Sequence, residues 1–387
     1  LDAERYPLLG AVIEQTSERI VFDRVYDLDR DLFLRDHCIG GRPSERDPQI
    51  RAIPVMPFTY SMEICAQAAA RLVARADRVV TAIENARGSR WLALDQGQLH
   101  LRIVAERVAA SLEQDEIHCR LFLLDQGGPA SGIGVFETRV LLAAGYPLAP
   151  GAMPWTSPDT QRPRFNADPL QLYERGMFHG PRLQGARAVQ RWGEHNIDMQ
   201  LEVLPTQDYF AFTSAPVFQT DATLCDVLGQ TLYYWVQECH GALLNVFPFQ
   251  IARLSLYAPP QSAGTRLSSR AQLQLPAPQR LEAAVEVRDA EGRVLMRVDG
   301  WEDRSFEVPE RFYQFRVDPP RRFIGEPWMD GLLPPGLHAR RVAPFEGDLL
   351  DSGGGIWGRG LAHMVLAPSE RALPGRGDRG EGREGPR

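Results

Sequence analysis

The chain has 387 residues, of which 44% are hydrophobic and 24% are charged, and its formal net charge is −7. This composition excludes intrinsic disorder for the bulk of the chain, and the acidic balance argues against nucleic-acid binding, which needs a basic face. No apolar run reaches about 18 residues, so no membrane span is expected. No signal peptide is visible, which predicts a cytoplasmic protein. The five cysteines are scattered and include no Cys-x-x-Cys pair, so we expect free thiols, with no disulfide framework or zinc site.

The first half of the chain combines one predicted helix with several strands. Residues 60–73 contain no Gly or Pro and are rich in alanine, with apolar residues at helical spacing, so they predict a mostly buried helix. Partly alternating patterns predict strands at residues 19–22, 91–105, 116–124 and 132–142. We assign residues 1–145 to an N-terminal unit, and the proline-rich residues 146–165 to a linker.

The second half repeats this plan. Residues 221–240 predict a long helix, and strands are predicted at residues 188–192, 197–203, 250–257, 266–275, 280–289 and 294–301. The repetition indicates two similar α+β units side by side, the second covering residues 166–320. Residues 321–387 form a C-terminal extension, in which 357–366 could begin another helix. The low-complexity end, residues 374–387, is expected to be disordered.

Three segments carry residues suited to catalysis. His37 is followed closely by Gly40 and Gly41, which leave open space beside its ring, so it is a candidate general base. The alternative is an ordinary histidine in a surface turn. Another of these segments, residues 176–185, is rich in Gly, Pro and aromatic residues. It could line a tunnel or form a simple turn between strands.

Asp226 and Gln230 are four residues apart on the second predicted helix and therefore share one face. The neighbours of Asp226 are apolar, and burial should raise the pKa of its carboxyl and make it a proton donor oriented by Gln230. The alternative is an acid in the first turn that complements the helix dipole.

Together, these segments resemble the dehydratase domain of modular and iterative polyketide synthases. The catalytic histidine of that family lies in a His-x-x-x-Gly-x-x-x-x-Pro motif, matched here by His37 and Gly41. Pro57 resembles the family proline that leads into the first long helix. Fifteen residues, 42–56, separate Gly41 from Pro57, where the family motif has four. This longer loop resembles the dehydratases of enediyne-type iterative synthases more than those of ordinary modular synthases.

Two further motifs complete the resemblance. The family's Gly-Tyr-x-Tyr-Gly-Pro motif is similar to residues 176–181, with Met177 and His179 in place of the two tyrosines. The family's Asp-x-x-x-Gln/His motif is matched by Asp226 and Gln230. Each motif alone is a weak signal, but their order along the chain fits the family.

The resemblance implies a double hotdog fold, in which two long central helices are each wrapped by a curved antiparallel sheet. It implies dehydration of a 3-hydroxyacyl thioester on an acyl carrier protein to a 2-enoyl thioester. His37 would take the α-proton, Asp226 would protonate the leaving hydroxyl, and Gln230 would orient Asp226. A backbone N–H near Gly41 or Gly180 would stabilise the enolate oxygen. The residues expected to bind or orient substrate are Gly41, Pro57, Tyr60, Phe178, His179, Gly180 and Pro181.

The resemblance also implies no metal and no organic cofactor beyond the phosphopantetheine of the carrier protein. The expected partners are the carrier protein, neighbouring synthase domains and a second copy in a homodimer. Three alternatives stay open: double-bond isomerisation on the same fold, cyclisation on the same fold, and a non-catalytic scaffold that binds carrier protein. A scaffold has no need for both His37 and Asp226, which favours the enzyme.

Overall fold

The computed structural model describes residues 4–39, 53–94, 97–124, 132–158, 173, 177–240, 244–277, 279–307, 337–339 and 366–368. Gly41 and most of the predicted extension, residues 321–387, therefore lie outside the described residues. Two short strands are described in the extension, Leu337–Ala339 (β15) and Leu366–Pro368 (β16), and they pair with each other. Of the helix suggested at residues 357–366, only Leu366 is described, and it begins β16.

The first half consists of antiparallel strands packed on one long helix. The helix α1, Phe58–Val73, begins after Pro57 and ends at Ala74, whose φ of 50° lies in the left-handed region that terminates helices. A short 3-10 helix, Leu32–Asp36 (η1), precedes His37. The strands are β1 (Ala11–Gln15), β2 (Arg19–Asp27), β3 (Cys38–Ile39), β4 (Ile53–Pro54), β5 (Val79–Gly88), β6 (Gln98–Ala110), β7 (Gln114–Leu123) and β8 (Ile133–Ala143).

The second half is built from the same kinds of element, with fewer strands. Its long helix α3, Ala222–His240, begins after Asp221, whose side-chain Oδ1 accepts a hydrogen bond from the Leu224 N–H (2.9 Å) as a helix cap. A second 3-10 helix, Pro181–Leu183 (η2), leads into the sheet. The strands are β9 (Ala186–Trp192), β10 (Asn196–Glu202), β11 (Leu244–Leu256), β12 (Arg266–Ala277), β13 (Arg280–Arg288) and β14 (Val294–Glu307).

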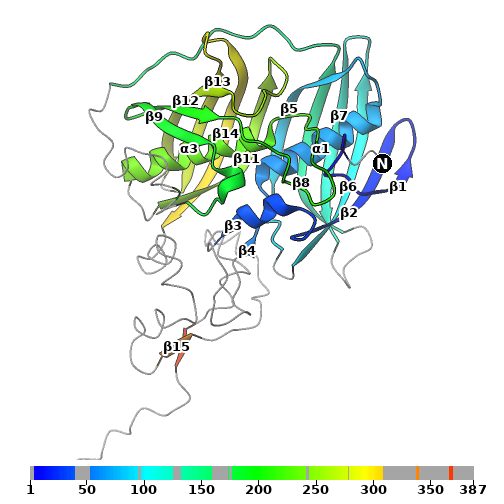
Figure 1. Ribbon diagram of the computed structural model, residues 1–387, viewed down its shortest axis with the longest axis horizontal. Helices are drawn as coiled ribbons and strands as arrows, with labels where there is room; N and C mark the ends of the chain where they lie inside the picture. Colours follow the sequence, from blue (N-terminus) through cyan, green and yellow to red (C-terminus); the bar gives the residue numbers. More distant parts are fainter. Residues whose placement is uncertain are drawn as a thin grey trace, which may run out of the picture.

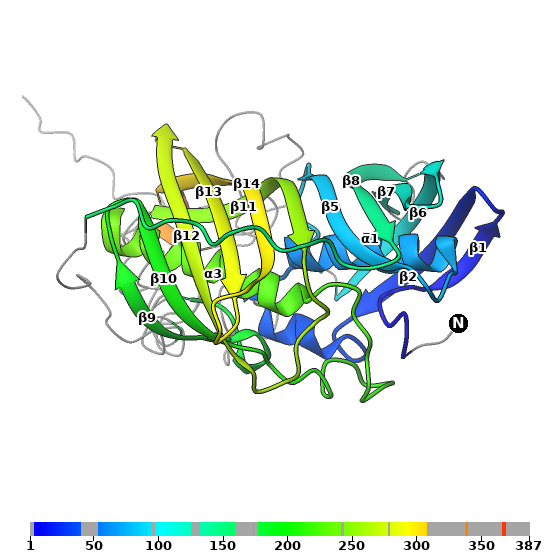
Figure 2. The ribbon, with the colours of Figure 1, turned by 90° about the horizontal axis from the view of Figure 1, so that it is seen from above.

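The strands of the two halves join into one antiparallel sheet of twelve strands. Its order is β1-β2-β6-β7-β8-β5-β11-β14-β13-β12-β10-β9, so the halves meet where β5 pairs with β11. Ala86 lies opposite Ile251, and Ile83 lies opposite Leu254. Figures 1 and 2 show the two halves side by side, each with its helix against the curved sheet. The expected separate sheet around each helix is therefore one continuous sheet shared by both helices.

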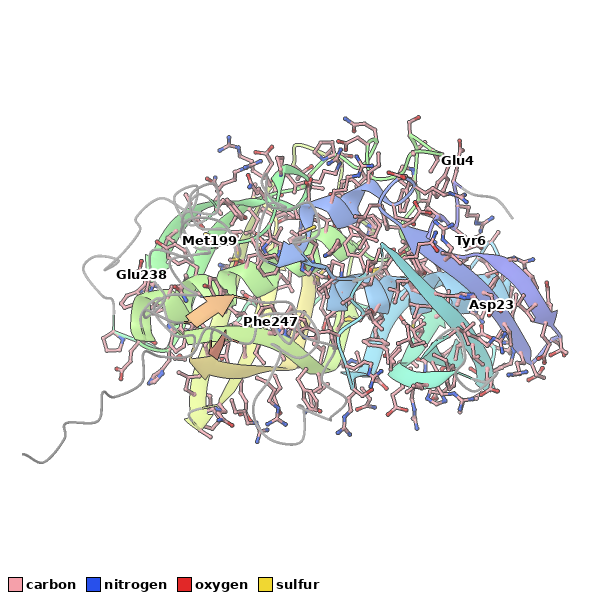
Figure 3. All side chains as sticks on the ribbon, turned by 90° about the horizontal axis from the view of Figure 1, so that it is seen from below. Glu4, Tyr6, Asp23, Met199, Glu238 and Phe247 are labelled. Atoms are coloured by element: carbon pink, nitrogen blue, oxygen red, sulfur yellow. The ribbon has the colours of Figure 1, made fainter. Side chains whose placement is uncertain are left out.

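The core lies between each helix and its own strands. Helix α1 contacts β2 and β5 to β8, while α3 contacts β9 to β12, and the two helices also contact each other. Small buried side chains on α1, such as Ala66 and Ala69, let the sheet approach closely. Figure 3 shows Asp23 and Met199 toward opposite ends of the molecule, with Phe247 of β11 near the middle.

The two long predicted helices and most predicted strands are present, with differences at several strands. Strand β6 begins at Gln98 rather than at residue 91, and β11 begins at Leu244 rather than at residue 250. The sequence patterns did not predict β1, β3, β4 and β5. The described part of the proposed linker, residues 146–158, forms neither helix nor strand. It is nevertheless fixed to the second half, because the backbone N–H of Met153 donates to Glu286 (2.9 Å) and the Thr156 hydroxyl donates to Asn196 (2.9 Å).

No helix in the part of the chain that the structure describes is both long and apolar enough to cross a bilayer.

Candidate active site

His37 is held at the end of η1 by its backbone and by its ring. Its backbone carbonyl accepts a hydrogen bond from the Val55 N–H (3.0 Å), and its backbone also forms an isolated antiparallel bridge with His179. The ring Nδ1 lies 2.6 Å from the carbonyl oxygen of Val55. Because a carbonyl can only accept, Nδ1 carries the hydrogen and Nε2 of the neutral ring keeps its lone pair.

Asp36, the residue before His37, forms an ion pair with Arg182 that joins the His37 segment to the His179 segment. Asp36 Oδ2 accepts hydrogen bonds from the backbone N–H (2.9 Å) and the guanidinium (3.0 Å) of Arg182. The Gly180 N–H donates to the Asp36 carbonyl (2.7 Å). A Cβ at Gly180 would lie 2.4 Å from Asp36 Oδ1, so this close approach requires glycine. The Gly180 N–H is therefore not available to an enolate oxygen, while the other expected source, the segment around Gly41, lies outside the described residues.

Asp226 and Gln230 project from the first turns of α3. The Gln230 Nε2 donates to Asp226 Oδ2 (3.0 Å) and to the carbonyl of Leu183 (2.8 Å). Its Oε1 accepts a hydrogen bond from the Tyr173 hydroxyl (2.5 Å). The amide is thereby fixed on both sides, as expected for a residue that orients the carboxylate.

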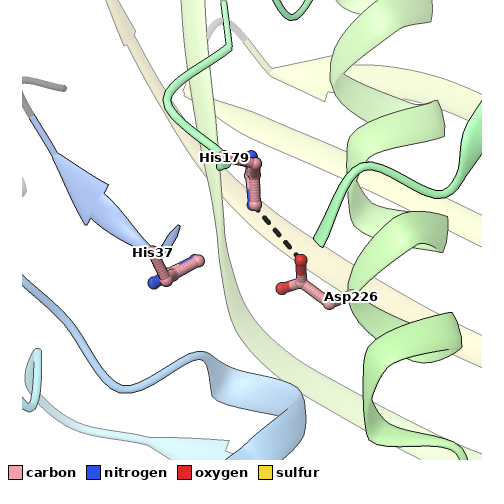
Figure 4. Close-up of side chains that lie close together, drawn as sticks. All are labelled: His37, His179 and Asp226. Carbon is pink, nitrogen blue, oxygen red and sulfur yellow. Dashed lines mark ion pairs between the residues drawn. The ribbon is translucent and has the colours of Figure 1, made fainter. Parts of the chain in front are cut away.

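His179 contacts Asp226 directly, a pairing that no motif in the sequence predicts. Nε2 of His179 lies 3.2 Å from Oδ2 of Asp226 (Figure 4). One potential ligand atom from each of His37, His179 and Asp226 lies within 4.8 Å of the others. Phe178 stacks on the His179 ring (centroids 4.3 Å apart) and meets the His37 ring edge-on (4.9 Å). Two histidines and a carboxylate thus share one aromatic-walled cluster.

The electrostatics of this cluster differ from expectation at Asp226. Burial raises the pKa of its carboxyl, but the two histidines and the Gln230 amide more than offset burial and hold it below its usual value. The expectation that the surroundings of Asp226 raise this pKa is therefore wrong in direction, because both histidines come from segments far from the helix in the sequence. Burial lowers the pKa of His37 to about 4 despite the nearby Asp226, which keeps its ring neutral.

A cavity of about 810 Å³ opens beside the cluster and is lined by His37, Phe178, His179, Asp226 and Gln230 among others. Four residues predicted to bind or orient substrate do not line it: Pro57, Tyr60, Gly180 and Pro181. Tyr60 is instead packed in the core, where its ring stacks on Phe33 (4.4 Å) and its hydroxyl bonds the Thr223 hydroxyl (2.8 Å). Pro57 immediately precedes α1 and Pro181 begins η2, so both shape the backbone around the site.

Asp303 is a second buried carboxyl on the cavity wall. The indole N–H of Trp301 donates to its Oδ1 (2.5 Å), and burial raises its pKa to about 7. In the unfolded chain it ionises near its ordinary pKa of about 4. The folded state thus binds the Asp303 proton more tightly than the unfolded state does. The stability that this proton contributes is therefore lost as the pH rises from about 4 toward 7.

We therefore expect Asp303→Asn, which keeps the acceptor oxygen, to stabilise the protein above about pH 7 by up to about 4 kcal/mol. Melting temperatures of parent and variant across about pH 5–8 test this, and the gain should grow with pH. Asp299→Asn, at an exposed position of the same strand, is the control. A gain that is the same at both ends of the range would contradict the buried-carboxyl explanation.

Comparisons with known proteins agree with this architecture. A family model described as "Polyketide synthase dehydratase N-terminal domain" matches residues 152–311, and no curated protein matches the chain. A GphF dehydratase variant made for improved crystallization is 20% identical, with a TM-score of 0.56, over 78% of this chain and 99% of that chain. The fold is that of polyketide synthase dehydratase domains.

Two more solved dehydratase domains show the same likeness. The dehydratase domain from the CurJ module of the curacin polyketide synthase is 16% identical, with a TM-score of 0.54, over 78% of this chain and 97% of that chain. A variant of the PpsC dehydratase domain from Mycobacterium tuberculosis is 21% identical, with a TM-score of 0.53, over 79% and 100%. Nearly the whole length of each dehydratase domain is therefore represented in this chain.

Proposed function

We propose that the protein removes water from a 3-hydroxyacyl thioester carried on an acyl carrier protein, giving a 2-enoyl thioester. The observation that carries this proposal is a neutral, oriented histidine close to a carboxylate on the wall of a large cavity. Loss of water needs a base at the α-carbon and an acid at the β-hydroxyl. The likeness to dehydratase domains supports the same reaction.

His37 is the proposed base. The Val55 carbonyl holds hydrogen on Nδ1, so the Nε2 lone pair is free to accept the α-proton. One solved structure of the CurJ dehydratase is an inactive mutant in which a histidine is replaced by phenylalanine. This supports a histidine-dependent reaction on this fold.

The proposed acid is the pair formed by His179 and Asp226. Because Asp226 is ionised in the free site, the proton for the leaving hydroxyl is held between its Oδ2 and Nε2 of His179, which are 3.2 Å apart. Gln230 fixes Asp226 as the proton leaves. The hydroxyl departs as water and the α-proton remains on His37. The site is reset when His37 gives up that proton and the His179–Asp226 pair takes up one proton in its place.

Arginines on the cavity wall support a carrier-linked substrate. Arg87 and Arg304 both lie over the Phe249 ring, at 5.3 and 4.5 Å from its centroid, and both line the cavity. Their charges suit the phosphate of a phosphopantetheine arm. We also propose a homodimer and closeness to enediyne-type iterative synthases, on the resemblance and on the long loop after Gly41.

The test is to incubate the full chain with 3-hydroxyacyl thioesters of several lengths, on pantetheine and on carrier protein, and to follow loss of water by mass spectrometry. Water loss, and hydration of the 2-enoyl thioester in reverse, are the expected results. No turnover in either direction on any of these substrates would contradict the proposal.

One second candidate is double-bond isomerisation, because a matched structure is an isomerase-inactive variant of the GphF dehydratase and because the second histidine, His179, provides another proton acceptor. Nuclear magnetic resonance of the product locates the double bond. Migration of the double bond away from the thioester would favour this candidate.

A further inference from the structure

The cluster of His37, His179 and Asp226 on the cavity wall has the composition of a transition-metal site. Two imidazoles and one carboxylate is a ligand set found in zinc enzymes, with the remaining position open to water or substrate. Imidazole ligands select borderline transition metals over Mg²⁺ and Ca²⁺. We propose that His37, His179 and Asp226 bind one Zn²⁺ ion, and that the ion blocks dehydration while it is bound.

The distances allow this with small side-chain movements. The three ligand atoms lie within 4.8 Å of one another, whereas zinc bonds of about 2.0–2.2 Å place tetrahedral ligands about 3.4 Å apart, so the widest pair must close by roughly 1.4 Å. Nδ1 of His179 is buried and has no hydrogen-bond partner among the described residues. Among the described residues, Asp226 is therefore the polar partner of this ring, and a turn toward a shared ion would break no other polar contact of the ring.

The surroundings already supply outer contacts for two of the three proposed ligands. A metal-bound histidine usually donates its other N–H to a carbonyl or carboxylate, and His37 donates from Nδ1 to the Val55 carbonyl. The carboxylate ligand is held by Gln230. His37 and His179 are each only 8% exposed, and Phe178 packs against both rings, so the ion would be shielded from bulk water on that side.

The same geometry explains why the ion inhibits. Zn²⁺ would occupy the Nε2 lone pair of His37, which is the pair that accepts the α-proton in the proposed reaction. It would also take the Asp226 oxygen that shares the proton with His179. This inhibitory part rests on the proposed function, whereas metal binding by itself does not.

Binding is tested with Co²⁺ as a spectroscopic probe on the full chain without an affinity tag. We expect a visible d–d absorption that saturates at one ion per chain and is displaced by Zn²⁺. Since loss of an outer-shell partner alone costs about 10–100-fold in metal affinity, His179→Phe should weaken binding by at least about 100-fold. Asp226→Asn is the second variant, should His179→Phe fail to fold, and should likewise weaken binding.

His195→Phe is the matched control, because the His195 side chain is 59% exposed and lies outside the cluster. It should bind Co²⁺ like the parent. No visible band, an unchanged band in folded His179→Phe, or a sulphur-to-cobalt charge-transfer band that assigns the ion to a cysteine would overturn the site.

Inhibition is measured separately, by adding one equivalent of Zn²⁺ to the dehydration assay and then removing it with EDTA. Reversible loss of activity is expected. Full activity with the ion bound would overturn the inhibitory part. A protein that binds Co²⁺ but dehydrates nothing even without metal would contradict the proposed function and leave the metal site standing.

Discussion

His37→Phe is expected to lower the rate of water loss by about 10²–10⁴-fold, the range over which a general base contributes. Phenylalanine fills the space of the ring and can keep the edge contact with Phe178, but it has no lone pair for the α-proton. It also removes the hydrogen bond to the Val55 carbonyl. Initial rates on a 3-hydroxyacyl pantetheine thioester, measured by mass spectrometry, give the ratio.

The matched control for this variant is again His195→Phe, which makes the same substitution at an exposed histidine of the second half. Near-ultraviolet circular dichroism establishes that both variants are folded. A folded His37→Phe protein with the parental rate would exclude His37 as the base and would leave the cavity without a neutral histidine in that role.

Glu63→Ala is expected to lower the free energy of unfolding by roughly 3–5 kcal/mol, because each buried donor left without an acceptor costs about 1–3 kcal/mol. Glu63 lies on α1 and is fully buried. Its carboxylate accepts hydrogen bonds from the backbone N–H groups of Gln219 (2.7 Å) and Thr220 (2.8 Å). It also accepts from the Thr220 hydroxyl (2.6 Å) and the Gln67 amide (2.9 Å).

Urea unfolding followed by circular dichroism measures this loss. Glu63→Gln keeps one acceptor oxygen and should fall between the parent and Glu63→Ala. Glu291→Ala, at a side chain that is 69% exposed, provides the baseline for removing an ordinary surface carboxylate. If Glu63→Ala unfolds at the same urea concentration as Glu291→Ala, the buried carboxylate does not join α1 to the segment before α3.

The fold was predictable where local patterns suffice. Helix α3 covers Ala222–His240, close to the predicted range 221–240, because the apolar spacing and the capping Asp221 are both local features of the sequence. Strand β5 was missed because it is covered by partners on both sides, β8 from its own half and β11 from the other. Its alternation is broken by four successive buried residues, so the pattern of a half-exposed strand is absent.

The site was predictable as a set of residue types but not as an arrangement. The motifs brought His37, Asp226 and Gln230 together, and the structure places all three on one cavity. His179 pairs with Asp226 because the segment before η2 lies against α3 in the folded chain. No residue spacing in the sequence predicts that contact. The same distant partner reverses the pKa shift of Asp226 that its apolar neighbours alone would give.

The pairing of β5 with β11 has a consequence for attempts to divide the protein. Cutting between the halves would leave each with a long unpaired strand edge, and such edges pair with any available chain. A separately produced half should therefore be isolated as an edge-to-edge dimer or an aggregate rather than as a monomer. Mixing the two halves should give a two-chain form of the parent protein only if the halves associate with each other faster than each associates with its own copies.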